Sequence, residues 1–388
     1  MLTRAIEKTI DHYLTSQSFK ALYIWGPRRS GKTTLLEKLS QELGVVKFNF
    51  DFESDREKFV PRREILAKLV KENRVILIDE VQNYPEATVM LKLLHDEFKV
   101  KVIATGSSEL RQKSKNFDTM AGRFTETFCL PLSSLEIADN EEIKPSERAE
   151  YENNLATYLQ IFGAYPEIYT KRESLETERI DLLQNILEAY VLKDVIAIYD
   201  LKNTKLAKDI LLKIALQIGS EVSLREIANS LGANVATVSN YVEVFIKNYI
   251  LIPLPAFKTN ARRAVSLNRK LYFYDLGLRN ILVQDFRPLQ LRPDKGGVFE
   301  NFIISEIEKQ RKIYNLKINL YFYREYGGKE IDLVIEDYKK TYTCLEIKVG
   351  LESAKKIFPL PHTLATINAK NYFKKINELC RVSLPITV

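Results

Sequence analysis

"ALYIWGPRRSGKTTLLEKL" (residues 21–39) combines an apolar run, a glycine-rich turn and apolar residues at helical spacing. Gly26 and the tripeptide Gly31-Lys32-Thr33 fit the pattern G-x-x-x-x-G-K-[ST]. Such a loop turns its backbone N–H groups, with those at the start of the helix, toward phosphate oxygens. The predicted contacts of a bound nucleotide are Gly26, Pro27, Arg28, Arg29, Ser30, Gly31, Lys32, Thr33 and Thr34.

Two side chains of this loop carry most of the expected chemistry. Lys32 is predicted to place a positive charge on the β- and γ-phosphates of ATP, so it also counts as a catalytic residue. The hydroxyl of Thr33 is predicted to bind the Mg²⁺ that accompanies the nucleotide. ATP and Mg²⁺ are therefore the expected cofactors.

"RVILIDEVQ" (residues 74–82) supplies a second half for this site. Four apolar residues predict a buried strand of a parallel sheet, and Asp79 follows them at the carboxyl end, where such sheets place ligands. We expect Asp79 to bind Mg²⁺ and Glu80 to polarise the attacking water.

"KVKVIATGSS" (residues 99–108) predicts a further strand that ends in small hydroxyl side chains. Ser107, with Thr105 and Ser108, is placed to sense the γ-phosphate. The alternative is that these hydroxyls only cap the turn after the strand. Strands that alternate with helical stretches predict an α/β domain with a parallel sheet.

Composition narrows the classes of protein. The formal net charge of +7 permits contact with nucleic acid without requiring it. Three scattered cysteines predict neither a disulfide framework nor a zinc site and fit a cytoplasmic protein. The amino terminus is patterned as an amphipathic helix rather than a secretory signal, and no apolar run is long enough to cross a membrane.

Four segments together resemble the AAA-related ATPases of archaea and bacteria that carry a carboxyl-terminal domain of unknown function. They are "GPRRSGKTTLL", "LIDEVQ", "TGSS" and "AGRFTETFCLPLSSLE" (residues 121–136). The resemblance implies a sheet with the additional strand of AAA-type ATPases. It also makes Arg123 a candidate catalytic contact of the γ-phosphate, although a structural arginine that anchors the next strand is the alternative. "LQIFGAYPEIY" (residues 159–169) is similar to the Gly-Gly-Phe-Pro-Glu signature of the family, with Ala164 and Tyr165 as departures.

"VSLREIANSLGANVATVSNYVEVFIKNYIL" (residues 222–251) has the pattern of a helix-turn-helix. Gly232 makes the turn, and the buried face of the second helix is predicted to begin at Val235. Thr237 and Asn240 then point outward, as short polar side chains that reach DNA bases or phosphates do.

"FKTNARRAVSLNRKLYFYD" (residues 257–275) alternates basic and apolar residues, as expected for the two-stranded wing of a winged helix. The basic residues predicted to follow a DNA backbone are Lys258, Arg262, Arg263, Arg269 and Lys270. Winged helices also serve as protein-docking modules, so DNA contact and protein contact both stay open.

The carboxyl-terminal third carries carboxylates and a lysine at the spacing of a nuclease. Asp332 lies on one strand-like stretch, and Glu346 and Lys348 share a face of the next. With Glu300 on the preceding helix, Asp332 and Glu346 could hold a second Mg²⁺, while Lys348 orients water. The resembled family carries the same E, E-x-D and E-x-K elements, which implies a PD-(D/E)XK nuclease-like fold without implying cleavage.

The expected fold class is α/β, with a P-loop NTPase domain followed by a helical and winged-helix region and a restriction-nuclease-like domain. The predicted boundaries are 1–140, 141–205, 206–275 and 276–388. The leading hypothesis is a Mg²⁺-dependent ATPase whose nucleotide state controls a DNA-binding module that is also a candidate for DNA cleavage. The rival hypothesis is a non-catalytic nucleotide switch that docks protein partners. Self-association into a homo-oligomer stays open, and no membrane contact is expected.

Overall fold

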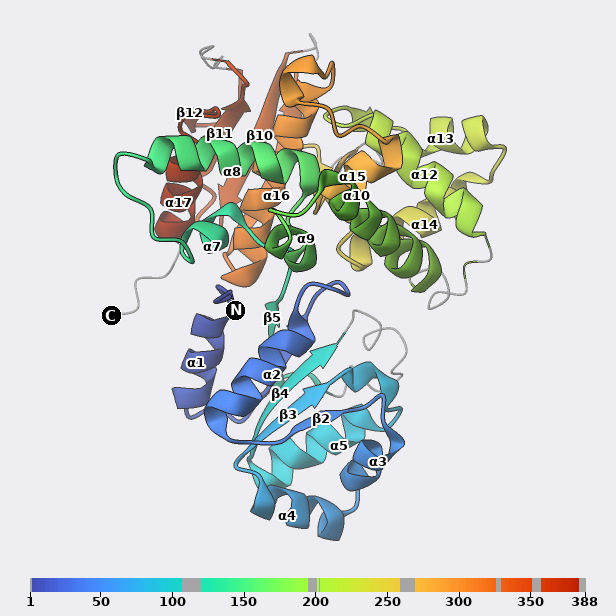
Figure 1. Ribbon diagram of the computed structural model, residues 1–388, viewed down its shortest axis with the longest axis vertical. Coiled ribbons are helices and arrows are strands. Elements are labelled where there is room, and N and C mark those ends of the chain that lie inside the picture. The colour runs from blue at the N-terminus through green and yellow to red at the C-terminus, as the bar shows by residue number, and fades with distance from the viewer. Residues whose placement is uncertain are drawn as a thin grey trace. The chain divides into compact units, whose positions relative to one another are not determined.

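The computed structural model describes residues 2–106, 120–194, 201, 203–258, 269–325, 329–350 and 357–383. The chain divides into two compact units, Met1–Leu130 and Pro131–Val388. The segments 141–205, 206–275 and 276–388 all belong to the second unit. Each unit is described separately (Figure 1).

The first unit is built on a parallel five-stranded sheet with the order β2-β3-β4-β1-β5. Strand β4 lies between β1 and β3, which confirms the additional-strand order of an AAA-type sheet. All five residues of β1 and of β3 are buried, as apolar strands covered on both faces should be. The strands are β1 (Ala21–Trp25), β2 (Lys47–Asn49), β3 (Val75–Asp79), β4 (Lys101–Gly106) and β5 (Phe124–Phe128).

Helices α1 and α2 share a core with one face of this sheet. Ile10 of α1, Leu36 of α2 and Leu77 of β3 are each fully buried in that cluster. Lys38 of α2 and Glu7 of α1 join the two helices through an ion pair of 2.5 Å. Among the described residues of this unit, the α-helices are α1 (Glu7–Thr15), α2 (Lys32–Leu43), α3 (Glu53–Arg56), α4 (Arg63–Glu72) and α5 (Ala87–Leu93), and the π-helical segment η3 (Leu94–Phe98) follows α5.

Helices and a small antiparallel sheet begin the second unit and share one apolar core. The sheet has the order β6-β8-β7. Its strands are β6 (Glu221–Val222), β7 (Leu251–Pro255) and β8 (Arg269–Phe273). Where the structure describes this region, the α-helices are α7 (Ser134–Ala138), α8 (Arg148–Phe162), α9 (Pro166–Thr170), α10 (Glu176–Asn185), α12 (Thr204–Leu216), α13 (Leu224–Leu231), α14 (Val235–Lys247) and α15 (Leu276–Val283), and the π-helical segment η5 (Ile186–Asp194) follows α10.

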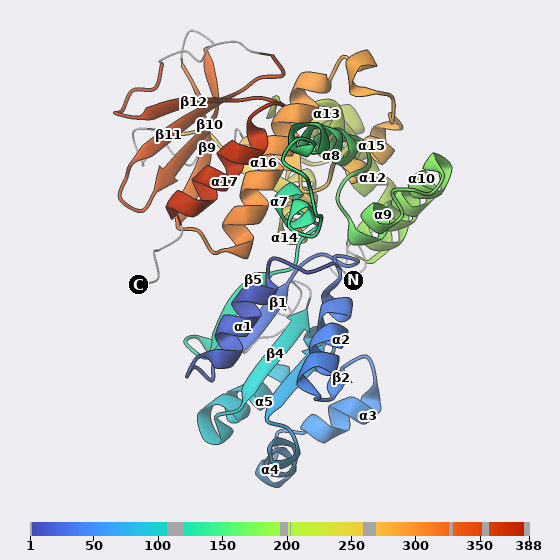
Figure 2. The same cartoon turned by 60° about the vertical axis from the view of Figure 1, so that its left-hand side comes forward.

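A mixed four-stranded sheet ends the second unit, with the order β12-β11-β10-β9. The β9–β10 and β10–β11 pairs are antiparallel, whereas β11 and β12 are parallel. Helices α16 and α17 lie side by side against the sheet, where Phe302 and Tyr372 pack ring to ring at 5.3 Å (Figure 2). The elements are α16 (Lys295–Ile313), β9 (Ile318–Arg324), β10 (Glu330–Asp337), β11 (Tyr342–Ile347), β12 (Thr363–Ile367) and α17 (Tyr372–Ser383).

The glycine of "FGAYPE" has a structural role within the second unit. Gly163 ends α8 with φ +78°, and a methyl group added there would lie 2.1 Å from Oδ1 of Asp275. The backbone N–H of Ala164 donates to Oδ2 of the same carboxylate at 2.6 Å. Pro166 then opens α9 at a position where no N–H is needed. The motif therefore folds the chain around a buried carboxylate.

Candidate functional site

The glycine-rich loop joins β1 to α2 at the carboxyl edge of the parallel sheet. Gly26 cannot carry a side chain, because an added Cβ would lie 1.9 Å from the carbonyl oxygen of Cys129. Gly31 caps α2 with φ +93°, a left-handed conformation that glycine adopts without strain. Thr33 and Thr34 are exposed in the first turn of α2. These features leave the loop and helix start open toward a phosphate.

The ammonium of Lys32 is held by the loop itself. Its Nζ donates to the carbonyl oxygens of Gly26 at 2.9 Å and Pro27 at 2.8 Å. Burial lowers the pKa of Lys32, and the negative charges of Glu80 and Asp79 oppose that shift. A triphosphate would offer stronger acceptors than these two carbonyls, so the residues present fit an anionic ligand.

The predicted carboxylates lie at the same edge of the sheet. Asp79 ends β3 and is buried, and its Oδ1 accepts a hydrogen bond from the hydroxyl of Thr105 at the end of β4. Glu80 follows with φ +52°, a strained conformation for a residue with a side chain. The side-chain amide of Gln82 donates to the Glu80 carboxylate and orients it. Lys32, Asp79 and Glu80 are therefore brought together, as the sequence predicted.

Arg4 is a contributor that sequence reasoning missed. Its buried guanidinium donates to the carbonyl oxygens of Ser30 at 2.6 Å and Leu130 at 2.7 Å. The amino-terminal segment thus ties the glycine-rich loop to the chain after β5. No motif signals this role, because Arg4 precedes the loop by more than twenty residues.

Arg123 was expected to contact the γ-phosphate, but the structure places it too far from the glycine-rich loop to reach a nucleotide bound by the same chain. Arg123 directly precedes β5, and the β1–β5 register pairs Phe124 with Ala21 at the amino end of β1. The loop leaves the other end of that five-residue strand, roughly 17 Å away at 3.3 Å per residue. Arg123 instead forms an ion pair of 2.8 Å with Asp96. Contact with a nucleotide on a neighbouring chain stays a prediction.

Four predicted contacts fall outside the residues that the structure describes. Ser107 and Ser108 were expected at the γ-phosphate, and Arg262 and Arg263 on the wing. Those expectations stay predictions.

The second unit brings three carboxylates together at one place. Glu300 of α16 meets Glu330 and Asp332 of β10, with one oxygen of each lying within 4.8 Å of the other two. Sequence reasoning named Glu300 and Asp332 but not Glu330, which its E-x-D spacing to Asp332 would have identified. Burial raises the pKa of Asp332 to about 7, and the negative charge of Glu300 adds to that shift.

The predicted pair Glu346 and Lys348 adjoins this cluster. Lys348 Nζ lies 3.2 Å from Glu346 Oε2 and 4.0 Å from Asp332 Oδ2. The backbone N–H of Ile347 donates to Asp332 at 2.7 Å. Asp332, Glu346 and Lys348 are therefore neighbours, but the three closest carboxylates are those of Glu300, Glu330 and Asp332.

Lys270 corrects an expectation about the wing. The sequence placed it on a surface that follows a DNA backbone, yet its side chain is only 1% exposed. Its Nζ lies 2.9 Å from Glu300 Oε1 and also pairs with Glu330. Two of the clustered carboxylates therefore already hold a cation from the chain itself, and the cluster as built does not fit a metal ion.

The helix-turn-helix segment presents the side chains that were predicted to face outward. Thr237 and Asn240 of α14 are exposed, while Val238 and Val242 are buried. Val235 was expected in the buried face but is 41% exposed, because it is the first residue of the helix. Lys258 is half-buried, and Arg269 pairs with Glu243 at 2.8 Å. Thr237 and Asn240 are thus accessible to a partner.

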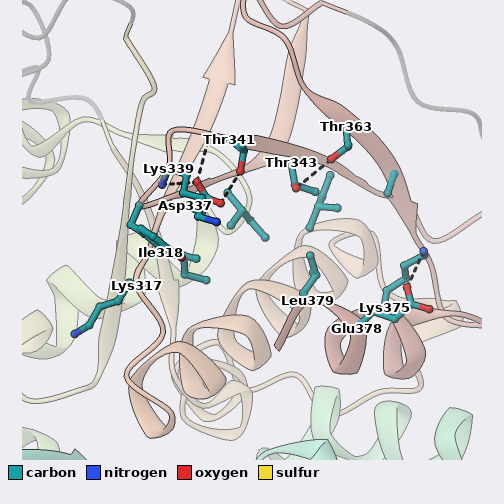
Figure 3. A pocket seen from close by; sticks show the side chains of 14 residues that line it. Lys317, Ile318, Asp337, Lys339, Thr341, Thr343, Thr363, Lys375, Glu378 and Leu379 are labelled. Carbon is teal, nitrogen blue, oxygen red and sulfur yellow. Dashed lines mark hydrogen bonds and ion pairs between the residues drawn. The ribbon is translucent and has the colours of Figure 1, made fainter. Parts of the chain in front are cut away.

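A cavity of about 500 Å³ lies between the four-stranded sheet and α17 (Figure 3). Several of its polar side chains pair with one another: Asp337 accepts from Thr341 at 2.6 Å, and Lys375 pairs with Glu378 at 3.0 Å. Thr363 and Thr343 are joined by a hydroxyl contact of 3.1 Å.

Three family models match successive parts of the chain. Residues 18–138 match the family model described as an AAA domain. The first unit has an AAA-type P-loop fold. Residues 153–290 and 295–375 match two families described as domains of unknown function, DUF8612 and DUF4143.

Similar proteins occur in Haemophilus influenzae and Methanocaldococcus jannaschii. An uncharacterized protein of Haemophilus influenzae is 23% identical over 91% of this chain and 87% of its own. The uncharacterized protein MJ1544 of Methanocaldococcus jannaschii is 25% identical, over 89% of this chain and 78% of its own.

Among solved structures, the RuvB Holliday junction branch migration motor of Thermotoga maritima superposes at a TM-score of 0.31. It is 18% identical and covers 64% of this chain and 89% of its own. AMPPCP-bound DnaA from Aquifex aeolicus has a TM-score of 0.31 with 17% identity, over 61% of this chain and 85% of its own.

Within the described residues, no helix combines the length and apolar character needed to cross a membrane.

Proposed function

We propose that the first unit binds and hydrolyses ATP with Mg²⁺. The observation that carries the proposal is the edge of the sheet where Lys32, Asp79 and Glu80 meet. The buried ammonium of Lys32 rests on neutral carbonyls, which phosphate oxygens can replace. Its position after a strand and before a helix is the arrangement that cradles nucleotide phosphates.

Each residue has a role that follows from its surroundings. Lys32 would bind the β- and γ-phosphates and offset the charge that develops on transfer of the γ-phosphoryl group. Thr33 and Asp79 are the oxygen donors that would hold Mg²⁺, which when bound offsets phosphate charge. Glu80, oriented by Gln82, would position and polarise the attacking water.

We further propose that nucleotide state in the first unit controls DNA binding by the second. The chain order α12-β6-α13-α14-β7-β8, with β8 between β6 and β7, is that of a winged helix and supports this assignment. Thr237 and Asn240 are exposed on α14, in the place of a recognition helix. The α16-β9-β10-β11-β12 order supports a nuclease-like fold after it.

The decisive experiment is an ATPase assay on the full chain with and without duplex, single-stranded and branched DNA. We expect Mg²⁺-dependent hydrolysis that DNA stimulates, and DNA affinity that falls as salt rises. Glu80→Gln should lower the rate by about 10²–10⁴-fold, the usual contribution of a general base. Glu80→Gln should leave ATP binding intact. The control is Lys71→Ala, at an exposed site on α4, which should change neither the rate of hydrolysis nor ATP binding.

Two results would contradict the proposal in different ways. Wild-type hydrolysis by a Lys32→Ala variant would refute the assigned site. Nucleotide binding without turnover or DNA affinity would instead favour a switch that docks protein partners.

A further inference from the structure

A lysine from the three-stranded sheet occupies the carboxylate cluster of the second unit. Lys270 belongs to β8, and its Nζ lies 2.9 Å from Glu300 Oε1 and pairs with Glu330 Oε1. Both are members of the group whose oxygens, with Asp332, lie within 4.8 Å of one another. The ammonium therefore engages the oxygens that a metal ion would need.

Neighbouring groups hold Lys270 in this position. Tyr272, two residues along the same strand, donates to the same Glu300 oxygen at 2.5 Å. Arg324 donates to the other oxygen of Glu330 at 2.8 Å and pairs with Glu221 of β6 at 2.9 Å. Strand β8 is itself paired on both sides, with β6 and with β7. Withdrawal of the lysine would leave the largely buried Glu300 carboxylate without its cation, and Glu330 with Arg324 alone among the described residues.

We propose that Lys270 is the resident cation of this cluster and excludes divalent metal from it. A divalent ion on the same oxygens would lie within roughly 4 Å of the ammonium, and like charges in a poorly solvated place repel strongly. Mg²⁺ also keeps several water ligands, whereas these carboxylate side chains are only 13%, 17% and 14% exposed.

The consequence is that the nuclease-like carboxylates serve as an internal ion network. The network joins β8 to α16 and β10, and thereby fastens the three-stranded sheet to the nuclease-like fold. The second unit would then hold DNA without cutting it through a metal at these residues. This inference concerns the second unit alone, so it stands or falls independently of ATP hydrolysis in the first.

Direct titration of the nucleotide-free full chain with Mn²⁺ tests the proposal on the wild type. Free Mn²⁺ is followed by electron paramagnetic resonance, and Glu330→Gln marks binding that belongs to the cluster. We expect the two proteins to bind Mn²⁺ alike, with no cluster-dependent binding tighter than about 1 mM. A submillimolar site that Glu330→Gln abolishes would overturn the proposal.

Removal of the lysine supplies the second arm. Lys270→Met keeps an apolar stem without the charge and should tighten Mn²⁺ binding by at least about tenfold. The gain should vanish when Asp332→Asn is added. Lys348→Met is the matched control, because this half-exposed lysine pairs with Glu346 at 3.2 Å and lies 4.0 Å from Asp332.

The lysine variants can also contradict the proposal. A folded Lys270→Met protein without the gain, or an equal gain in Lys348→Met, would show that Lys270 is not what excludes the metal. If Lys270→Met is unfolded without metal, recovery of its circular dichroism with Mn²⁺ supports the proposal, and the wild-type titration still decides it.

Discussion

Lys32 and Lys270 are both buried, at 5% and 1% exposure, but their ammonium groups are held by different acceptors. Lys32 donates to two main-chain carbonyls of its own loop. Lys270 pairs with the carboxylates of Glu300 and Glu330. The first lysine is solvated by neutral dipoles, whereas the second is neutralised by charge.

In the part of the chain that the structure describes, the charge of Lys32 is not balanced by a carboxylate hydrogen-bonded to it, whereas the charge of Lys270 is balanced by Glu300 and Glu330. Burial lowers the pKa of Lys32, and nearby Glu80 only opposes that effect. Burial also acts to lower the pKa of Lys270, but Glu300 and Glu330 more than offset it, so the pKa lies above the usual value. An incoming phosphate would relieve the first lysine, while any incoming cation must compete with the second.

The largest effect should come from removal of the charge-paired lysine. Lys270→Met is expected to lower the free energy of unfolding of the full chain by about 3–5 kcal/mol, because Glu300 loses its cation and Glu330 keeps only Arg324 among the described residues. Lys32→Met should cost far less, since only carbonyl contacts are lost. Urea denaturation followed by circular dichroism compares the two. Equal losses would show that the nature of the acceptor does not matter.

Nucleotide affinity should reverse the order of the two variants. Lys32→Met is expected to weaken ATP binding by about 100-fold, since hydrogen bonds from a charged donor contribute up to about 3 kcal/mol. Lys270→Met should leave this affinity within about twofold, as its charge is committed elsewhere. Titration of a fluorescent ATP analogue measures both. A strong loss of ATP affinity in Lys270→Met would contradict the conclusion that only Lys32 serves the nucleotide.

A buried carboxylate extends the comparison to the opposite charge. Asp275 accepts from the backbone N–H groups of Ala164 at 2.6 Å and Leu278 at 3.1 Å, and burial raises its pKa. Gly163→Ala would force a methyl group against this carboxylate and strain a backbone at φ +78°. We expect a loss of about 1–3 kcal/mol in stability by thermal unfolding. Gly44→Ala, at another positive φ but with open space around it, is the control for backbone strain alone.

Local patterns predicted the first unit better than the second. The P-loop strand, turn and helix lie within residues 21–39, so the motif contains nearly all the information that positions Lys32. Lys270 was assigned to the surface because basic residues on an alternating strand usually face solvent. Its partners, Glu300 and Glu330, lie 30 and 60 residues away in sequence, and only the tertiary fold brings them to it.

Arg123 shows the same limit within the first unit. Its motif lies close in sequence to β5, yet the parallel pairing of β5 with β1 puts Arg123 at the edge of the sheet opposite the glycine-rich loop. Val235 is exposed although its spacing predicted burial, for a simpler reason: it is the first residue of α14 and lies before the turns that pack against the core. Periodicity describes helix interiors well and their ends poorly.

The smallest expected effect is that of Arg123→Ala, and it sharpens the comparison of charged partners at an exposed place. Arg123 pairs with Asp96, whose pKa is held at about 2 mainly by hydrogen bonds from Arg123 and His95. Because the pKa of Asp96 is lower in the folded chain, the ion pair stabilises the fold at pH values above the pKa of Asp96 in the unfolded chain, near 4. This stabilisation is lost as the pH falls toward 2. Both side chains are about one-third exposed, so solvent screens the pair and the loss of stability at neutral pH should be slight.

The ATP affinity of the isolated chain should be unchanged in Arg123→Ala, because the arginine lies at the far edge of the sheet. If hydrolysis falls in Arg123→Ala only at protein concentrations where chains associate, the arginine acts on the nucleotide of a neighbour; a fall at all concentrations would contradict the position assigned to it here.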